Sequence, residues 1–396
     1  MLDPAAKKPR QTLLSFGTNN SPPLKFIDHD SYIIGTHKDC KALEKIAAFD
    51  LDQTLIQVKS GKTYPKDHND WLLGKNVKDK LSEYYANGYK IVIISNQKGI
   101  KRVGVDNFKI KLSAIADSLK IPVQIYLSIG DDIYRKPRPG IWTILIPKHN
   151  DGIIPNVKES FYVGDAAGRV ALNGKKADFS LCDIKFALNA GLKFFTPEEI
   201  FNGEPAPSKK DLRETLVDLS SVPLGLTNEA KDIINYEHKK DCEVVLFFGY
   251  PASGKSHMTS IFQSKGYKTV STETPKKCIE LMTSYLKEKV SVVIDRTNIS
   301  KDSRSLFINA VKVIQSVDIF IRCIEMTASM DLCRHNAKFR EITNPEAEHI
   351  GTVVYHKMRK SYQPVDKSEG FDLIMQLPFY LDKDVDKFYF NYLLEN

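Results

Sequence analysis

Short apolar runs alternate with helical patterns along much of this chain. Three runs in the first half are too short for helices and end in polar or glycine residues: 46–49, 91–94 and 161–163. Between them, apolar residues recur at spacings of four, three and four over residues 108–119, which places them on one face of a helix. Buried strands that alternate with helices predict a mainly parallel sheet with helices on both faces.

A proline-rich polar stretch, EPAPSKK at 204–210, divides two α/β patterns. Beyond it, apolar runs at 244–248, 290–294 and 319–324 predict a second parallel sheet. The length of 396 residues also suits two domains. The expected parts are a disordered basic tail (1–40), a first α/β domain (41–203), a linker that packs on one domain (204–240) and a second α/β domain (241–396).

Composition excludes several classes of protein. With 42% hydrophobic residues the chain is not a largely disordered one, and it has no apolar run long enough to cross a membrane. Its first twenty residues contain no apolar segment of a secretion signal. The 6 cysteines are scattered without a CxxC pair, as expected of reduced cytosolic or nuclear thiols. The formal charge of +8 favours an anionic partner.

Two acids follow the first strand, Asp50 and Asp52. Ligands of a doubly wound sheet bind beyond the carboxyl ends of its strands, so these carboxylates are expected in a crevice. They would repel each other unless a cation such as Mg²⁺ separates them. Asp50 can then attack phosphorus to form an aspartyl phosphate. Asp52 can protonate the leaving oxygen and later activate water.

Three further groups follow other predicted strands. Ser95 can donate a hydrogen bond to a phosphate oxygen, Lys136 can neutralise the phosphoryl charge, and Asp165 supplies another metal carboxylate. We predict metal ligation by Asp50, Asp52 and Asp165. The sequence does not decide whether Asp178 or Asp183 supports this site.

The text around these residues resembles the haloacid dehalogenase phosphatases, and more closely the bifunctional polynucleotide phosphatase/kinases of DNA end repair. The resemblance covers residues ~45 to 200 and rests on FDLDQTLI, ISNQKGI, YRKPRPGIW, VGDAAGR and DFSLCD. It implies a Mg²⁺-dependent 3′-phosphatase. Gln53 departs from the glycine usual at its position.

The resemblance also implies a rim that contacts the substrate. We predict substrate binding by Asn96, Gln97 and Arg135, of which Arg135 follows from its place beside Lys136. Other cations are expected on the same rim: Lys98, Lys101, Arg102 and Arg138. Such residues contact nucleic-acid phosphates without reading the base sequence. Each of them is equally compatible with a solvated charged face.

The second α/β pattern opens on the predicted strand 244–248, which leads into GYPASGKS. These eight residues match the motif GxxxxGKS, and a helical pattern follows them. In this context the motif predicts a phosphate-binding loop. We predict nucleotide binding by Gly249, Ser253, Gly254, Lys255 and Ser256, with Ser256 also binding Mg²⁺. ATP is the expected phosphoryl donor.

Later residues indicate phosphoryl transfer. Asp295 ends a buried strand in IDRTN, and RHNAKFREI contains Arg334 and Arg340, which could clamp the phosphoryl group from a mobile lid. Residues ~242 to 390 resemble the kinase half of the same family. That family usually has an Arg-Asp pair where this chain has Thr272 and Glu273. Three alternatives stay open: Glu273 is the base, Asp295 replaces it, or the kinase is weak.

The sequence therefore predicts an enzyme that removes 3′-phosphates and phosphorylates 5′-hydroxyls at nucleic-acid ends, most readily DNA strand breaks. The alternative is a 3′-phosphatase whose degenerate P-loop domain only binds ATP or DNA. A basic cluster at 7–10 could be a nuclear localisation signal, although a solvated basic tail is the simpler interpretation; nuclear localisation is the expectation. Only 49 residues precede Asp50, too few for the phosphopeptide-binding domain of many animal members, although repair-scaffold proteins stay candidate partners. A monomer is expected.

Overall fold

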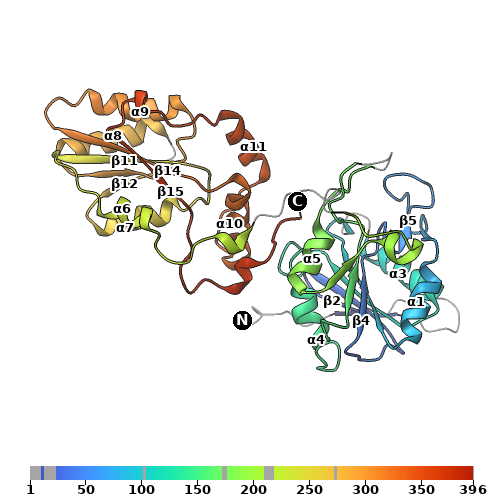
Figure 1. The fold of residues 1–396 in the computed structure, drawn as a ribbon. Helices are drawn as coiled ribbons and strands as arrows, with labels where there is room; N and C mark the ends of the chain where they lie inside the picture. Colours follow the sequence, from blue (N-terminus) through green and yellow to red (C-terminus); the bar gives the residue numbers. More distant parts are fainter. Residues whose placement is uncertain are drawn as a thin grey trace. The chain divides into compact units, whose positions relative to one another are not determined.

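The computed structural model describes residues 10–12, 24–100, 104–171, 176–208, 218–271 and 274–395, with the backbone alone for 10–12. The chain forms two compact units, which are described separately. The first comprises Met1–Leu216 together with Asn391–Asn396, and the second comprises Val217–Phe390 (Figure 1). Within the described residues, no helix has the length and apolar character that a membrane crossing requires.

The first unit is built on an eight-stranded sheet of order β1-β2-β3-β8-β7-β4-β9-β10. Its strands are β1 (Arg10–Thr12), β2 (Leu24–Asp28), β3 (Tyr32–His37), β4 (Ile46–Phe49), β7 (Lys90–Asn96), β8 (Val123–Ser128), β9 (Phe161–Val163) and β10 (Lys193–Phe195). The five neighbouring strands β8, β7, β4, β9 and β10 are parallel to one another. The strands β1, β2 and β3 continue the sheet beyond β8 in antiparallel pairing. A separate hairpin joins β5 (Ile56–Gln57) and β6 (Leu72–Leu73).

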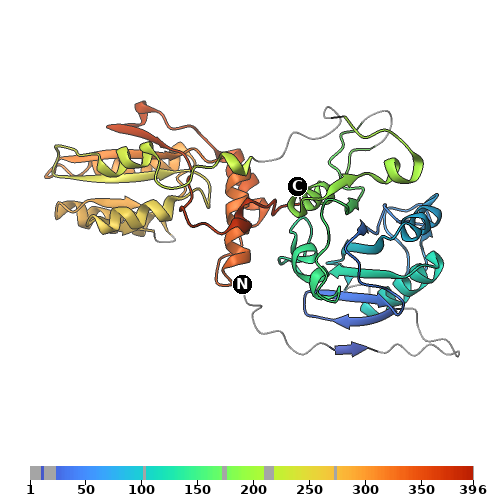
Figure 2. The same ribbon diagram turned by 60° about the horizontal axis from the view of Figure 1, so that its bottom comes forward.

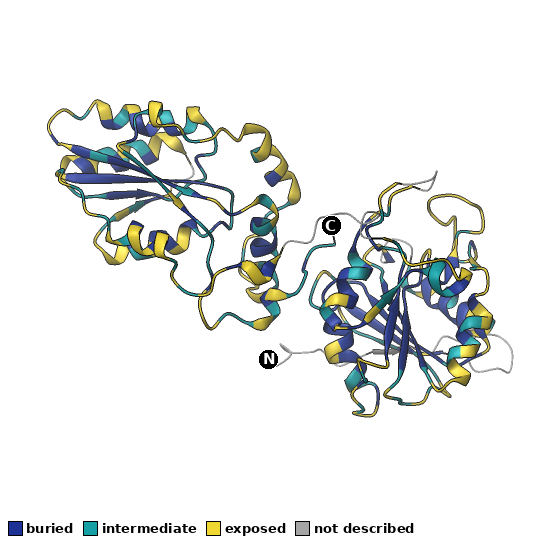
Figure 3. Ribbon diagram, viewed as in Figure 1, coloured by how far each residue is buried: buried dark blue, intermediate teal, exposed yellow. Residues whose placement is uncertain are grey.

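Helices cover both faces of this sheet because its central strands are buried on both sides (Figure 3). Ala47 and Phe49 of β4 pack with α1 (Val77–Ala86), α3 (Val105–Leu119) and the π-helix η2 (Glu198–Asn202). Ile46 and Ala48 pack with α5 (Cys182–Ala190), the π-helix η1 (Ile141–Leu145) and α4 (Ile146–Lys148). The helix predicted from the apolar spacing over residues 108–119 is therefore confirmed as α3.

The second unit contains a five-stranded, wholly parallel sheet of order β12-β13-β11-β14-β15. Its strands are β11 (Cys242–Phe248), β12 (Lys268–Val270), β13 (Val292–Ile294), β14 (Ile319–Met326) and β15 (Leu373–Leu377). One face packs on α8 (Pro275–Lys287) and α9 (Lys301–Lys312), and the other on α6 (Asn228–Asn235) and α7 (Lys255–Ser264) (Figure 2). Two more helices, α10 (Met330–Thr343) and α11 (Thr352–Ser361), complete the unit. The predicted fold class, two parallel-sheet α/β domains, is confirmed.

Three boundaries differ from the sequence prediction. Residues 24–37 are not a disordered tail, because β2 and β3 pair with each other and β3 pairs with β8. The predicted linker 204–240 includes α6, whose Ala230 and Ile233 are fully buried in the second unit. The last residues, Asn391–Asn396, group with the first unit. The basic residues at 7–9 lie outside the described part of the chain.

Candidate active sites

A buried cluster of charge lies at the carboxyl end of the first sheet. Lys136, which is 1% exposed, donates hydrogen bonds from Nζ to Asp50 Oδ1 (2.7 Å) and Asp183 Oδ1 (2.8 Å). The hydroxyl of Tyr162 accepts from Lys136 Nζ (2.7 Å) and donates to Asp183 Oδ1 (3.0 Å). Four segments that are far apart in the sequence thus meet around one ammonium group.

Asp165 completes this cluster. Its backbone N–H donates to Thr54 Oγ1 (3.1 Å), which links the turn after β4 to the turn after β9. Gly164 is required beside it, because a Cβ there would lie 2.4 Å from Cγ of Asp183. Carboxylate oxygens of Asp50, Asp165 and Asp183 all lie within 4.8 Å of one another. Three hard oxygen ligands at this spacing fit a divalent cation.

The pKa values follow from this crowding. Burial raises the pKa of Asp50 well above its ordinary range, Lys136 opposes this, and Asp183 and Asp165 add to it. Burial, followed by the charge of Asp183, raises the pKa of Asp165 to about 7. Burial would lower the pKa of Lys136, but Asp183 and Asp50 outweigh it and raise that pKa. One ammonium faces three carboxylates, so a bound cation would relieve the excess negative charge.

Asp52 lies at the open side of this site, with half of its side chain exposed. Gln97 Nε2 donates to Asp52 Oδ2 (2.6 Å) and to Ser95 Oγ (2.9 Å). Lys111 Nζ, from the buried face of α3, lies 3.6 Å from Asp52 Oδ1. An acid that is exposed to water yet fixed in orientation can exchange protons with a substrate and with solvent.

The predicted substrate-binding residues fall into different roles. Gln97 contacts Asp52, as described above. The side-chain amide of Asn96 bonds both backbone groups of Lys136, donating to its oxygen (2.9 Å) and accepting from its nitrogen (3.0 Å), so it positions Lys136. Arg135 Nε donates to Glu395 Oε1 at 2.5 Å.

The predicted rim of cations is only partly present. Lys98 is exposed and pairs with Asp131 at 3.1 Å. Arg138 was expected on the same rim, but it is 1% exposed and bonds Asp131 at 2.7 Å, so that prediction was wrong. Lys101 and Arg102 lie outside the described residues.

Sequence reasoning missed two residues of this site and left a third undecided. Tyr162 sits within a three-residue strand, where an aromatic residue reads as core. Lys111 lies three residues after Phe108 and four before Ile115, on the buried face of α3. A lysine on an apolar helix face was therefore the available signal. Between the two undecided acids, Asp183 contacts Lys136, whereas Asp178 pairs with Arg169 at 2.9 Å.

Gln53 occupies a strained position in the turn that holds the two acids. Its φ of 65° lies in the left-handed region, where a glycine costs least. The departure from the usual glycine therefore places strain in the backbone directly after Asp52 and removes no reactive group.

The second unit brings its phosphate loop to the end of the fully buried strand β11. The loop turns into α7 at Gly254, whose φ of 99° favours glycine. Lys255 Nζ donates to the backbone oxygens of Tyr250 (2.5 Å) and Gly249 (3.2 Å) and lies 3.4 Å from Ser253 Oγ. Burial lowers the pKa of Lys255 to about 8. Ser256 is exposed at the first turn of α7, where backbone N–H groups favour an anion.

The segment that contains Asp295 is tied to this loop. Asn298 Nδ2 donates to Phe247 O (2.8 Å), and Gly249 N–H donates to Thr297 O (3.0 Å). Asp295 raises the pKa of Lys255 and Arg340 lowers it, although burial is the larger influence. Glu273, the other candidate base, lies outside the described residues, as does Thr272.

The predicted lid corresponds to helix α10, which packs beside the phosphate loop. Asn336 Nδ2 donates to Ala252 O at 3.0 Å, and Tyr355 of α11 donates to Pro251 O at 3.3 Å. Arg334 bonds Asp331 at 3.1 Å on the same helix, and Arg340 is exposed. Both arginines lie on α10, and their predicted role as a clamp on the phosphoryl group stays a prediction.

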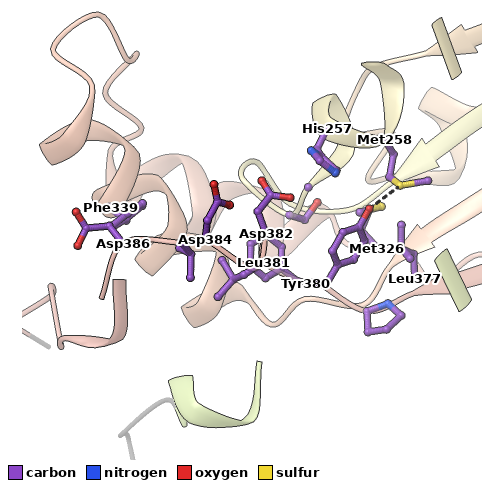
Figure 4. A pocket seen from close by; sticks show the side chains of 15 residues that line it. His257, Met258, Met326, Phe339, Leu377, Tyr380, Leu381, Asp382, Asp384 and Asp386 are labelled. Carbon is purple, nitrogen blue, oxygen red and sulfur yellow. Dashed lines mark hydrogen bonds between the residues drawn. The ribbon is translucent and has the colours of Figure 1, made fainter. Parts of the chain in front are cut away.

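A pocket of about 390 Å³ adjoins the phosphate loop (Figure 4). Gly254, His257 and Met258 line one side, and residues 377–382 of the segment after β15 line the other. Tyr380 reaches across the pocket and its hydroxyl lies 3.5 Å from Met258 Sδ. The size and the mainly apolar wall suit a flat aromatic group.

The two sites define a chain that combines a phosphatase of the haloacid dehalogenase class with a P-loop kinase fold. The family model "Polynucleotide kinase 3 phosphatase" matches residues 45–201. A "Bifunctional polynucleotide phosphatase/kinase" of Schizosaccharomyces pombe is 34% identical over 90% of this chain and 85% of its own. A protein of Acanthamoeba polyphaga mimivirus is 30% identical over 95% of both chains. A "Polynucleotide 3'-phosphatase ZDP" of Arabidopsis thaliana is 40% identical over 40% of this chain and 24% of its own. The chain belongs to the bifunctional polynucleotide phosphatase/kinase family.

Proposed function

We propose that this protein repairs nucleic-acid ends by hydrolysing 3′-phosphates in its first unit and phosphorylating 5′-hydroxyls in its second. The observation on which the phosphatase depends most is the contact of Lys136 with both Asp50 and Asp183. The protein would convert strand breaks that carry a 3′-phosphate and a 5′-hydroxyl into breaks that carry a 3′-hydroxyl and a 5′-phosphate. Polymerases and ligases require those ends, and DNA strand breaks are the substrate we favour.

In the phosphatase, Asp50 attacks phosphorus and forms an aspartyl phosphate. Asp52 first gives its proton to the leaving 3′-oxygen and then takes one from the attacking water. Gln97 and Lys111 hold Asp52 in place for both steps. Lys136 neutralises charge on the phosphoryl group, and Ser95 donates to one of its oxygens.

We assign the acidic cluster to Mg²⁺, which Asp50 and Asp165 would hold, whereas Asp52, also predicted as a ligand, lies outside this cluster at the open side of the site. Bound Mg²⁺ would supply positive charge that screens the carboxylates from the incoming phosphate. Asp183 lies within the same cluster, but its hydrogen bonds to Lys136 and to Ala166 N–H assign it a supporting role.

In the kinase, Gly249, Ser253, Gly254 and Lys255 are proposed to cradle the phosphates of ATP, with Ser256 on its Mg²⁺. The adjoining pocket is suited to the adenine ring. Arg334 and Arg340 neutralise the transferred phosphoryl group. Asp295 and Glu273 remain the two candidates for the base that receives the 5′-hydroxyl proton.

The experiment uses one oligonucleotide with a 5′-hydroxyl and a 3′-phosphate, Mg²⁺ and γ-labelled ATP. Asp50→Asn should abolish 3′-phosphate loss and keep 5′ labelling, and Lys255→Met should do the reverse, so each variant is the control for the other. If the unaltered protein removed the 3′-phosphate but did not label the 5′ end, the proposed kinase activity would be refuted. The alternative, a 3′-phosphatase with a degenerate P-loop domain, would then remain. A parallel RNA oligonucleotide compares the two substrates. Glu273→Ala and Asp295→Asn then identify the base.

Nuclear localisation is part of this proposal because chromosomal strand breaks occur there. The basic cluster at residues 7–10 supports it. Fusing residues 1–23 to a fluorescent protein, with Lys7 and Lys8 replaced by alanine in the control, tests whether this segment directs nuclear import. Equal distribution of both fusions would contradict that role.

A further inference from the structure

The segment 391–395 packs on the phosphatase unit, although it follows the kinase unit in the sequence. Here Tyr392 exchanges two hydrogen bonds with the Asn189 side chain, at 2.8 and 2.9 Å. Leu393 is 1% exposed. The segment 391–395 is therefore an integral part of the first unit.

Further contacts align this segment with helix α5. Lys185 Nζ, one helical turn before Asn189, donates to Leu394 O at 3.1 Å. The N–H of Leu181, just before the helix, donates to Glu395 O at 3.0 Å. The segment thus runs back along α5 towards the end that contains Asp183, the partner of Lys136.

The segment ends on the residue next to the catalytic lysine. Glu395 Oε1 accepts a hydrogen bond of 2.5 Å from Nε of Arg135. Arg135 is 14% exposed in its side chain and Glu395 is 33% exposed. Among the described residues, Arg135 Nη1 is buried and has no hydrogen-bond partner. A guanidinium is always charged and offers five N–H donors, so with Nε bonded to Glu395 and Nη1 buried, Nη2 is the nitrogen left to reach another anion.

We propose that Glu395 is a specificity-determining positioning residue of the phosphatase, which orients Arg135 towards an internucleotide phosphate of a polynucleotide substrate. The inference depends on the proposed function, since only a polynucleotide has a phosphodiester next to the 3′-phosphate. Arginine binds phosphate best when its planar guanidinium is held in a fixed orientation. Glu395 fixes that plane, and the tail segment fixes Glu395.

A competing arrangement uses the same contact with the opposite consequence. If the Glu395 carboxylate occupied the place of the substrate phosphate, the tail would compete with the substrate. Removing its charge would then strengthen binding of the oligonucleotide. Positioning predicts weaker binding, so the direction of the change in KM separates the two.

The experiment compares the full chain with Glu395→Gln, Arg135→Ala and the double variant. Glu83→Gln, an exposed acid on α1 of the same unit, is the matched control. The substrates are a 3′-phosphorylated oligonucleotide and p-nitrophenyl phosphate, which has no phosphodiester. For Glu395→Gln we expect a rise of about tenfold in KM for the oligonucleotide, with kcat changed less than twofold, from the loss of one charge-assisted hydrogen bond. In the Arg135→Ala background the same change should add less than twofold.

Three results would overturn the proposal: a lower KM for the oligonucleotide, an equal loss on both substrates, or full additivity with Arg135→Ala. Equal loss on both substrates would indicate that the segment only stabilises the fold, which thermal unfolding of each variant would check. If the unaltered protein hydrolysed p-nitrophenyl phosphate but no oligonucleotide, the proposed function itself would fail, and this inference with it.

Discussion

Binding of Mg²⁺ to the phosphatase site should depend strongly on pH near neutrality. A metal ligand must be ionised, so any carboxylate that is protonated in the free protein has to release its proton when the cation binds. Burial raises the pKa of Asp165 to about 7 and raises that of Asp50 well above its ordinary range. Mg²⁺ affinity should therefore fall as pH decreases through 7.

The size of the effect follows from Asp165 alone. With a pKa of about 7, its ionised fraction falls about tenfold between pH 8 and pH 6. The apparent Kd for Mg²⁺ should rise by about the same factor over that interval. A proton displaced from Asp50 would make the dependence steeper, so tenfold is the smallest change expected.

Isothermal titration of the full chain with Mg²⁺, without nucleotide, measures both quantities. Titrations at pH 6, 7 and 8 give the Kd, and buffers of different ionisation enthalpy give the number of protons released. Asp165→Asn should weaken binding at pH 8 by more than about tenfold and remove the Asp165 contribution to proton release. Asp79→Asn, an exposed acid on α1, should change neither. An affinity that is equal at pH 6 and pH 8, with no proton released, would refute the reasoning.

Three other predictions concern binding and stability. Because burial lowers the pKa of Lys255 to about 8, its positive charge is lost as pH rises. The Kd for ATP should therefore increase about tenfold between pH 7 and pH 9, which fluorescence titration with an ATP analogue measures. Lys255→Arg should make the Kd nearly independent of pH over this interval. Phe179 is 90% exposed between Asp178 and Ser180, so Phe179→Ala should raise KM for a single-stranded 3′-phosphorylated oligonucleotide about tenfold through lost base stacking, and an unchanged KM would exclude that contact. Arg304 is fully buried and donates hydrogen bonds to both carboxylate oxygens of Glu369 at 2.7 Å. Arg304→Met should therefore lower the free energy of unfolding of the second unit by about 3 to 5 kcal/mol, measured by urea unfolding. A decrease below about 1 kcal/mol would contradict the stabilising role of this buried ion pair.

The sequence predicted the centre of each sheet well because local pattern determines it. The run at 46–49 is β4 to the residue, and the chemistry of Asp50 follows from its place directly after that strand. The edge of the first sheet was missed for a physical reason. The strand Leu24–Asp28 follows Pro22 and Pro23, and its apolar side chains are buried by its place in the sheet beside Tyr32–His37 and by the core that it shares with α3. Edge strands depend on tertiary partners more than on their own composition.

Contacts between distant parts of the chain account for what pattern reasoning could not reach. Arg135 was predicted to contact substrate from its position beside Lys136, yet its nearest ionic partner lies 260 residues further along the chain. No periodicity relates residues so far apart. The same holds for Lys111, whose charge on an apolar helix face makes sense only once Asp52 is placed opposite it. Lys111 lies close to Asp52 at the open side of the proposed phosphatase site, and functional sites are where local sequence rules are most often broken. A lysine or arginine that violates the pattern of a predicted element should therefore be examined first as a partner of a catalytic carboxylate or of the substrate.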